Sequence, residues 1–295
     1  MGTVSSEPKK QRFQFIEEHR KQFGVRYLCR RLSVSHSGFY KWLVRPESQR
    51  EVDNKALTQT IRWLFDLHDG NYGSPRIHKT LVEEGQLVNR KRIARIMREE
   101  RLVAKAAKLY RRKSLPGSSC IKVGNLRWNV APPDGPNQQW AGDVSYLKLK
   151  GEWIYLSVIL DLYSRKVIGW SLGRNRTAEL TLKSLEMALS TRKIEPGLIF
   201  HSDKGSEYGA HDYQNRLRAA GIRPSMNRPK SMTDNIHVES FFRTFKTESF
   251  HGEVFEDEEH LYDVTQWYLN EYYNCHRMHT SLGFKSPVQY ERMVA

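Results

Sequence analysis

Hydrophobic residues follow two different spacings along the chain, which divide it into a helical N-terminal part and an α/β C-terminal part. Up to about residue 104, apolar side chains recur three or four positions apart, as they do on one face of an α-helix. Residues 153–160 are instead apolar on both alternating faces, which is typical of a strand inside a sheet. The chain is therefore predicted to carry small all-α modules ahead of an α/β domain.

The first module is predicted to span residues 1–50 and to have the character of a helix-turn-helix. Helices are expected near residues 10–22, over 25–32 and over 36–43. A helix-turn-helix would bring this module to DNA. A small helical bundle that binds nothing fits the same pattern, so both interpretations stay open.

A second helix-turn-helix is predicted within residues 51–104. Its helices are expected over 57–67, over 76–84 and from an Asn89 cap through Glu100. The last helix carries more cations than solubility requires, and we expect them to contact DNA phosphates. These cations are Arg90, Lys91, Arg92, Arg95, Arg98 and Arg101.

Residues 105–138 are predicted to be a basic linker, and residues 139–295 the catalytic domain with a helical tail. The linker is broken by Pro and Gly, and it could follow a DNA backbone or only connect domains. The catalytic domain has the pattern of three strands within 140–172, with hairpin turns at 150–151 and 163–165. We then expect helices over 177–190, 211–220 and 234–250, strands over 197–203 and 222–226, and a loop over 227–233. This order predicts an RNase H-like core, a mixed five-stranded sheet flanked by helices.

The net charge of +15 lies in the front of the chain. Residues 1–130 contain 28 Lys and Arg against 12 Asp and Glu, whereas residues 131–295 contain 20 against 21. Because a solvated surface would spread its charge, this asymmetry favours a polyanion-binding front attached to a nearly neutral domain.

Length and cysteine content restrict the class of protein. A chain of 295 residues with 39% hydrophobic content suits two or three domains. No run reaches the length of a membrane span and the polar start lacks a signal peptide, so a cytoplasmic protein without a membrane partner is expected. Cys29, Cys120 and Cys275 form no CxxC motif and no zinc spacing with histidine, so structural zinc is not expected.

Three acids have positions that suit a metal site for phosphodiester chemistry. Asp143 lies in the first expected strand, Asp203 ends the fourth, and Glu239 lies on the helix expected beside them, with 35 residues between the last two. Carboxylates of this kind can hold two divalent cations, one for the attacking and one for the leaving oxygen. On the same helix, Arg243 and Lys246 follow Glu239 at helical spacing and are expected to meet phosphate.

Each acid also has an ordinary explanation. Asp143 could be a charge at a strand edge, Asp203 a turn former, and Glu239 half of an exposed pair with Arg243. Other acids are assigned lesser roles. Asp161 is expected to accept hydrogen bonds from backbone amides in its turn, and Asp134 lies in the linker. Glu207 and Asp234 are expected either to support the site or to cap a helix next to it.

Three stretches carry a family resemblance: WAGDVSYLKLKGEWIYLSVILDLYSRKVIGWSL, HSDKGSEY and DNIHVESFFRTFKTE. They resemble the integrase core of bacterial insertion-sequence transposases of the IS-three group, specifically the product of their second reading frame, OrfB. YGSPRIHKTLVEEGQLVNRKRIARIMREE looks like the family's helix-turn-helix, YNCHRMHTSLGFKSPVQY like its closing motif, and the resemblance runs from Phe13 to Glu291. NRPKSMT differs from the family's usual wording, which leaves the contacts of that loop open.

The resemblance implies a DDE transposase that cleaves DNA at element ends and transfers the 3′-OH strand. It implies that Asp143, Asp203 and Glu239 are catalytic metal ligands, with two Mg²⁺ ions for which Mn²⁺ can substitute. Lys246 would contact the transposon end and Asn235 would shape the site or contact DNA. The implied partners are double-stranded DNA, at inverted-repeat ends and at the target, a second copy of the chain in a dimer or larger assembly, and the upstream-frame protein OrfA.

Several alternatives stay open. An RNase H-like nuclease would hydrolyse without strand transfer, and a DNA-binding regulator of transposition would do no chemistry. In this family the second frame is usually fused to an upstream frame with a leucine zipper, and no heptad repeat occurs here. The chain is therefore expected to be either a fragment of a fusion or a second-frame product that works beside one.

Overall fold

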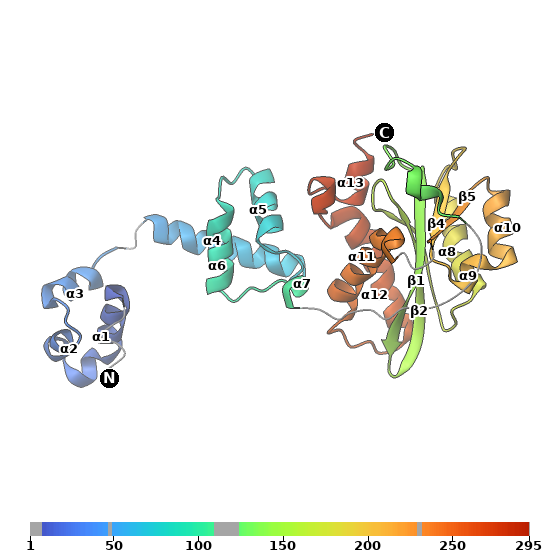
Figure 1. Cartoon of the computed structure of the whole chain (residues 1–295). Coiled ribbons are helices and arrows are strands. Elements are labelled where there is room, and N and C mark those ends of the chain that lie inside the picture. The colour runs from blue at the N-terminus through green and yellow to red at the C-terminus, as the bar shows by residue number, and fades with distance from the viewer. Residues whose placement is uncertain (1–7, 47–48, 109–123, 229–231, 295) are drawn as a thin grey trace. The chain divides into compact units, whose positions relative to one another are not determined.

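A computed structural model describes residues 8–46, 49–108, 124–228 and 232–294 (Figure 1). Residues 109–123 of the predicted linker, with Cys120, and positions 229–231 of the predicted NRPKSMT loop lie outside these residues. The chain divides into two compact units, Met1–Arg62 and Trp63–Ala295. The finer division at residues 50, 104 and 138 stays a prediction.

The first unit is a small helical module. Its core joins Phe13 and Ile16 to Leu28, Leu32 and Phe39, and apolar residues of the third helix pack around it. The Ser35 side chain caps that helix by accepting from the Gly38 amide at 3.2 Å. The helices are α1 (Lys9–Phe23), α2 (Val25–Arg31), α3 (His36–Leu43) and α4 (Gln49–Leu67), the last of which continues into the second unit.

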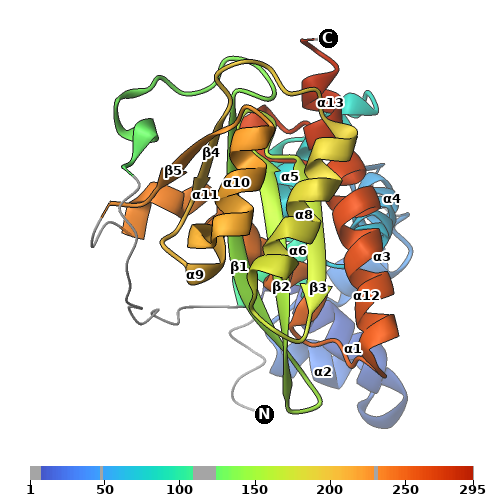
Figure 2. The same ribbon diagram turned by 90° about the vertical axis from the view of Figure 1, so that its right-hand side faces the viewer.

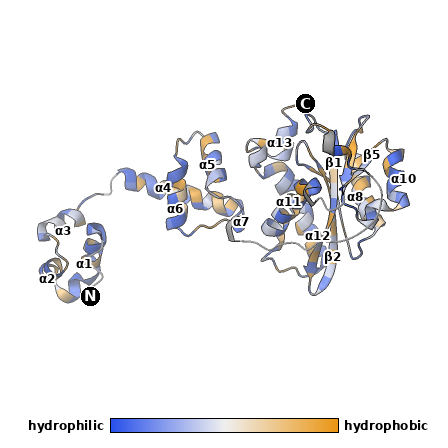
Figure 3. Cartoon of the chain, in the orientation of Figure 1, coloured by the Kyte–Doolittle hydropathy of each residue, from blue (hydrophilic) through white to orange (hydrophobic). Residues whose placement is uncertain are grey.

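The second unit begins with the helix pair expected for a helix-turn-helix. The pair consists of α5 (Ser74–Glu83) and α6 (Arg90–Glu99), and α7 (Lys105–Lys108) follows. The predicted cap is confirmed, because the Asn89 side chain accepts from the Lys91 amide at 2.8 Å. Ile77 and Leu81 are fully buried, as is Ile93 across the turn. Figure 3 shows hydrophilic and hydrophobic residues mixed along these helices, which fits their amphipathic pattern.

A five-stranded mixed sheet forms the centre of the second unit, which confirms the predicted fold class. The strands are β1 (Gln139–Leu149), β2 (Glu152–Asp161), β3 (Val167–Gly173), β4 (Ile199–Ser202) and β5 (Arg223–Met226). They lie in the order β3-β2-β1-β4-β5. β2 runs antiparallel to both of its neighbours, β1 and β3, whereas β4 is parallel to β1 and β5 is parallel to β4. Lys150 and Gly151 form the predicted tight turn with positive φ angles of 46° and 98°.

Helices cover both faces of this sheet (Figure 2). On one face, α8 and α10 pack against residues such as Trp140, Val144 and Ile159. On the other face, α11 and η5 pack against residues such as Ala141 and Leu156. The α-helices are α8 (Ala178–Thr191), α9 (Ser206–Gly209), α10 (His211–Ala219), α11 (Ile236–Phe245), α12 (Glu258–Gln266) and α13 (Pro287–Glu291). The remaining helical segments are η2 (Leu126–Asn129), η3 (Met232–Asn235), η4 (Lys246–Phe250), η5 (Trp267–His276) and η6 (Thr280–Leu282).

Two details differ from the expected elements. The single helix expected over 234–250 is three segments: the 3₁₀ turn η3, the α-helix α11 and the π-helical turn η4. Arg92 was expected on the exposed face of its helix but is half-buried, and its Nη2 atom is buried. Among the described residues, no helix is both long and apolar enough to cross a membrane.

Candidate active site

The pairing of β1 with β4 brings Asp143 and Asp203 together. The two parallel strands pair Trp140 with Phe200 and Ala141 with His201. Continued by two residues, this register places Asp143 opposite Asp203, which directly follows β4. Neighbouring strands lie about 4.8 Å apart, so the two carboxylates, 60 positions apart in sequence, share one patch of the sheet.

Asp143 faces the α11 side of the sheet. Side chains alternate along a strand, and Ala141 contributes to the core under α11 whereas Val144 contributes to the core under α8. Burial, then the Asp203 carboxylate, raises the pKa of Asp143 to about 8, and Glu239 adds to this effect. The acid of β1 therefore lies within electrostatic reach of both other predicted acids.

Asp203 lies in a network with Arg176 and Glu207. Its Oδ1 accepts from the Gly205 amide at 2.8 Å, and its Oδ2 lies 3.6 Å from Arg176 Nη2. The same guanidinium bonds the buried Glu207 carboxylate at 2.6 Å. Burial raises the pKa of Asp203, and Glu207 raises it further. One arginine therefore balances part of the negative charge of this group of carboxyls.

Glu239 reaches the site from α11. Val238, Phe241, Phe242 and Phe245 of this helix are buried against the sheet, as predicted. Glu239 lies on the flank of the helix beside this buried face, is exposed, and makes no ion pair with any other residue that the structure describes. A carboxylate left free beside two others is available for a ligand.

Lys246 lies at the end of α11, near Asp143. Its Nζ lies 4.5 Å from the centroid of the Tyr146 ring, which is a cation–π distance. Burial lowers the pKa of Lys246, and the Asp143 carboxylate opposes that effect. Arg243 is exposed on the same arc of the helix as Glu239.

Asn235 is a structural member of the site. The side chain is 2% exposed, and its Nδ2 donates to the Gly142 carbonyl at 3.2 Å. This bond ties the start of α11 to the residue before Asp143. Burial leaves Asn235 little surface for DNA, and its hydrogen bond to Gly142 fits the expected role in shaping the site; both roles stay predictions.

The chemistry of the three acids suits a hard divalent cation. All three offer carboxylate oxygens, which Mg²⁺ prefers. The pKa of Asp143 is raised first by burial and then by the Asp203 carboxylate, and a bound cation would offset both effects. Across the described ranges, no group of three His, Cys, Asp or Glu side chains is already arranged to hold a metal ion. The donor set fits, and the side chains would need to converge around the ion.

Sequence reasoning missed Arg176. It lies just after β3, in a loop with no motif that marks it, and only the fold brings it to Asp203 and Glu207. Two lesser predictions are confirmed. Glu207 adjoins the site, and Asp161 accepts from the Asn137 and Tyr163 amides at 2.7 and 2.9 Å.

Family models match most of the chain. An integrase core domain matches residues 133–232, a second integrase core model matches 220–287, and an HTH-like domain matches 51–113. Together with the mixed sheet and its helices, these matches define a polynucleotidyl transferase with an integrase core.

Curated relatives identify the branch of this class. The chain is 37% identical over 287 residues to the transposase InsF for insertion sequence IS3A of Escherichia coli (strain K12), covering 95% of this chain and 98% of that protein. It is 34% identical over 272 residues to an uncharacterized 31 kDa protein of insertion element IS600 from Shigella sonnei, covering 91% and 100%. The chain belongs to the IS3 family of insertion-sequence transposases.

Solved structures of retroviral integrases are more distant. The simian T-cell lymphotropic virus intasome in complex with a PP2A regulatory subunit has 17% identity and a TM-score of 0.44, covering 79% of this chain and 74% of that chain. The HTLV-2 integrase catalytic core in complex with magnesium has 17% identity and a TM-score of 0.39, covering 54% and 98%.

Proposed function

We propose that this transposase cleaves DNA at the ends of its insertion element and joins the freed 3′-OH strand to target DNA, with Mg²⁺ as cofactor. The observation that supports the proposal is the β1–β4 register, which, continued by two residues, sets Asp143 opposite Asp203. Glu239, on α11, is the third acid.

Asp143, Asp203 and Glu239 would hold the metal, with two ions as the expected number and Mn²⁺ as a substitute. When bound, such a pair activates the attacking oxygen and steadies the leaving oxygen of a phosphodiester. Two other residues would support this metal site. Asn235 positions β1 by its hydrogen bond to the Gly142 carbonyl, and Arg176 balances part of the carboxylate charge of Asp203.

DNA would be held by cations on α11, η4 and α6. Lys246 and Arg243 lie on the arc of α11 and η4 that carries Glu239, where they would contact phosphates next to the reacting bond. On α6, four cations are exposed, and one of them, Arg95, lies 3.7 Å from Glu99. The four are Arg90, Lys91, Arg95 and Arg98.

Further partners follow from the chemistry of joining two ends. We expect inverted-repeat DNA and target DNA as substrates, a second copy of the chain in a dimer or larger complex, and the upstream-frame protein as a fusion or companion. Analytical ultracentrifugation of the chain with and without end DNA tests the oligomer.

A joining assay tests the reaction. Labelled duplexes that end in the inverted repeat are incubated with plasmid and Mg²⁺, and joined products are expected from the wild type. Asp203→Asn and Glu239→Gln should abolish joining, whereas Asp212→Asn, which removes an exposed acid on α10, should not.

Each other outcome identifies a different protein. Cleavage without joined products would indicate a nuclease. Binding that falls steeply with salt and is indifferent to Asp203→Asn, without cleavage, would indicate a regulator. Joining that persists in Asp203→Asn would refute the assignment of the acids.

A further inference from the structure

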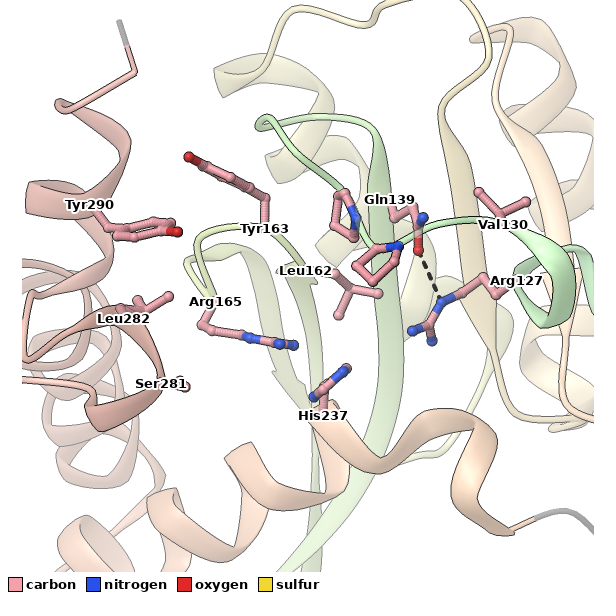
Figure 4. A pocket seen from close by; sticks show the side chains of 12 residues that line it. Arg127, Val130, Gln139, Leu162, Tyr163, Arg165, His237, Ser281, Leu282 and Tyr290 are labelled. Carbon is pink, nitrogen blue, oxygen red and sulfur yellow. Dashed lines mark hydrogen bonds between the residues drawn. The ribbon is translucent and has the colours of Figure 1, made fainter.

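A pocket of about 310 Å³ opens beside the start of β1 (Figure 4). Its lining comes from segments far apart in sequence, including Arg127, Gln139, Leu162, Arg165, His237 and Tyr290. In Figure 4 the Arg127, Arg165 and His237 side chains point into a common space. No part of the chemistry described for the acids uses this pocket.

The two arginines in this pocket lack a counter-ion. Arg165 forms no ion pair with any described residue, and its Nη1 is buried without a hydrogen-bond acceptor. Arg127 donates hydrogen bonds to neutral oxygens: its Nε donates to Gln139 Oε1 at 3.2 Å, and its Nη1 donates to the backbone carbonyl of Asp234 at 3.0 Å. Burial lowers the pKa of both guanidiniums, and each remains a cation because arginine stays charged in proteins.

Neighbouring acids attract these arginines without forming an ion pair with them: Asp234 opposes the lowering of the Arg127 pKa and Asp161 that of the Arg165 pKa. Asp161 accepts backbone amides on both of its oxygens. The Asp234 carboxylate is 3.1 Å from Arg228 and bonds the Asn125 amide at 2.7 Å. Partly buried charges are normally paired, so two unmatched guanidiniums in one pocket indicate a place for an external anion.

We propose that this pocket binds a phosphoryl group, and that in the working transposase this group is a backbone phosphate of bound DNA. Planar guanidiniums suit the oxygens of phosphate, to which arginine bonds in a bidentate manner. This assignment rests on the proposed function, because DNA must lie on this face for its backbone to enter the pocket.

The position of the pocket favours DNA over a free anion. Gln139 and Asp143 lie on the same face of β1, four residues apart, or about 13 Å at the rise of a strand. His237 precedes Glu239 by two residues on α11. With a rise of about 3.4 Å per nucleotide, a strand reacting at the acids would place a phosphate at the pocket a few nucleotides away.

Arg165→Gln in the full chain tests the proposal, with DNA binding measured in EDTA by fluorescence anisotropy over a series of salt concentrations. Loss of one phosphate contact should weaken binding about ten-fold or more and lower the salt slope by about 0.9. Arg216→Gln is the matched control, since Arg216 pairs with Glu186 on the opposite face of the sheet and its loss should leave the slope unchanged.

Methylphosphonate scanning locates the phosphate. A single neutral linkage, moved along the strand, should weaken wild-type binding at each contacted phosphate. At one of these positions, a few nucleotides from the cleaved bond, the effect should be absent in Arg165→Gln. This scan on the wild type also decides the matter if Arg165→Gln does not fold, and Arg165→Lys should then keep the slope while losing affinity.

Inorganic phosphate separates the two sources of anion. Thermal protection by phosphate that Arg165→Gln abolishes, with DNA binding and the scan unchanged, would mean a free-anion site and overturn the DNA assignment. No response of DNA or phosphate binding to Arg165→Gln would overturn the phosphoryl site itself. None of these measurements requires cleavage or metal. They therefore test the phosphate site independently of the joining assay, and a failure of one proposal can be told from a failure of the other.

Discussion

Replacing Glu248 by alanine should destabilise the second unit more than a typical substitution. Glu248 lies in η4, directly after the helix that carries Glu239, and is 4% exposed. Arg277 donates to both of its oxygens at 2.7 Å, and the Tyr268 hydroxyl donates at 2.8 Å. Arg76 of α5 adds a fourth contact at 4.0 Å. The substitution would leave the buried Arg277 guanidinium and the partly buried Arg76 guanidinium near each other without an acid.

The magnitude follows from these contacts. Hydrogen bonds to a charged group contribute about 1.5–3 kcal/mol each to stability. The sum over the three bonds of Glu248 is an upper limit on the loss, because the contributions of neighbouring groups are not additive. Removing one partner of a buried pair costs about 3–5 kcal/mol, since the other charge stays buried. We therefore expect Glu248→Ala to lose about 3–5 kcal/mol, which corresponds to roughly 6–20 °C in the melting temperature of a unit of this size.

Urea and thermal unfolding, followed by circular dichroism, measure this loss. Glu179→Ala is the control, because its ion pair with Lys183 lies on the surface of α8, with the Glu179 side chain 76% exposed, and should be worth less than about 1 kcal/mol. Changing both Glu248 and Arg277 to Met should recover much of the stability. A loss below about 1 kcal/mol for Glu248→Ala would refute this account of the ion pair.

Three further predictions concern the site and its supports. Folding raises the pKa of Asp143 from 3.8 to about 8, so the folded state binds that proton more tightly than the unfolded chain. The metal-free protein should therefore lose stability as the pH rises from about 4 to 8. In melts recorded in EDTA, Asp143→Asn should make the melting temperature less dependent on pH across that window. Gly169→Ala should cost about 1–3 kcal/mol in urea, because its Cβ would overlap the Ser184 carbonyl of α8, and an unchanged midpoint would contradict this close packing. Lys246→Ala should lower the salt slope of DNA binding by about 0.9, and an unchanged slope would remove Lys246 from the DNA contacts.

Local features of the fold were predictable because their causes are local. The Asn89 cap, the Lys150–Gly151 turn and the amide bonds of Asp161 each depend on residues close in sequence. The order of strands and helices was also enough to predict the mixed sheet. The prediction failed where a helix changes type: nothing in the pattern of residues 234–250 announces the π-helical turn at η4.

Sequence by itself determined the candidate acids, their spacing and the basic front of the chain, since composition, periodicity and motif spacing are properties of the linear order. Only the tertiary structure decided what surrounds those acids. Arg176 meets Asp203, Glu248 meets Arg277, and Arg127 meets Arg165 across 27 to 38 positions. Such encounters depend on how the sheet and helices pack, and a guanidinium carries no local signal of which carboxylate or phosphate it will face.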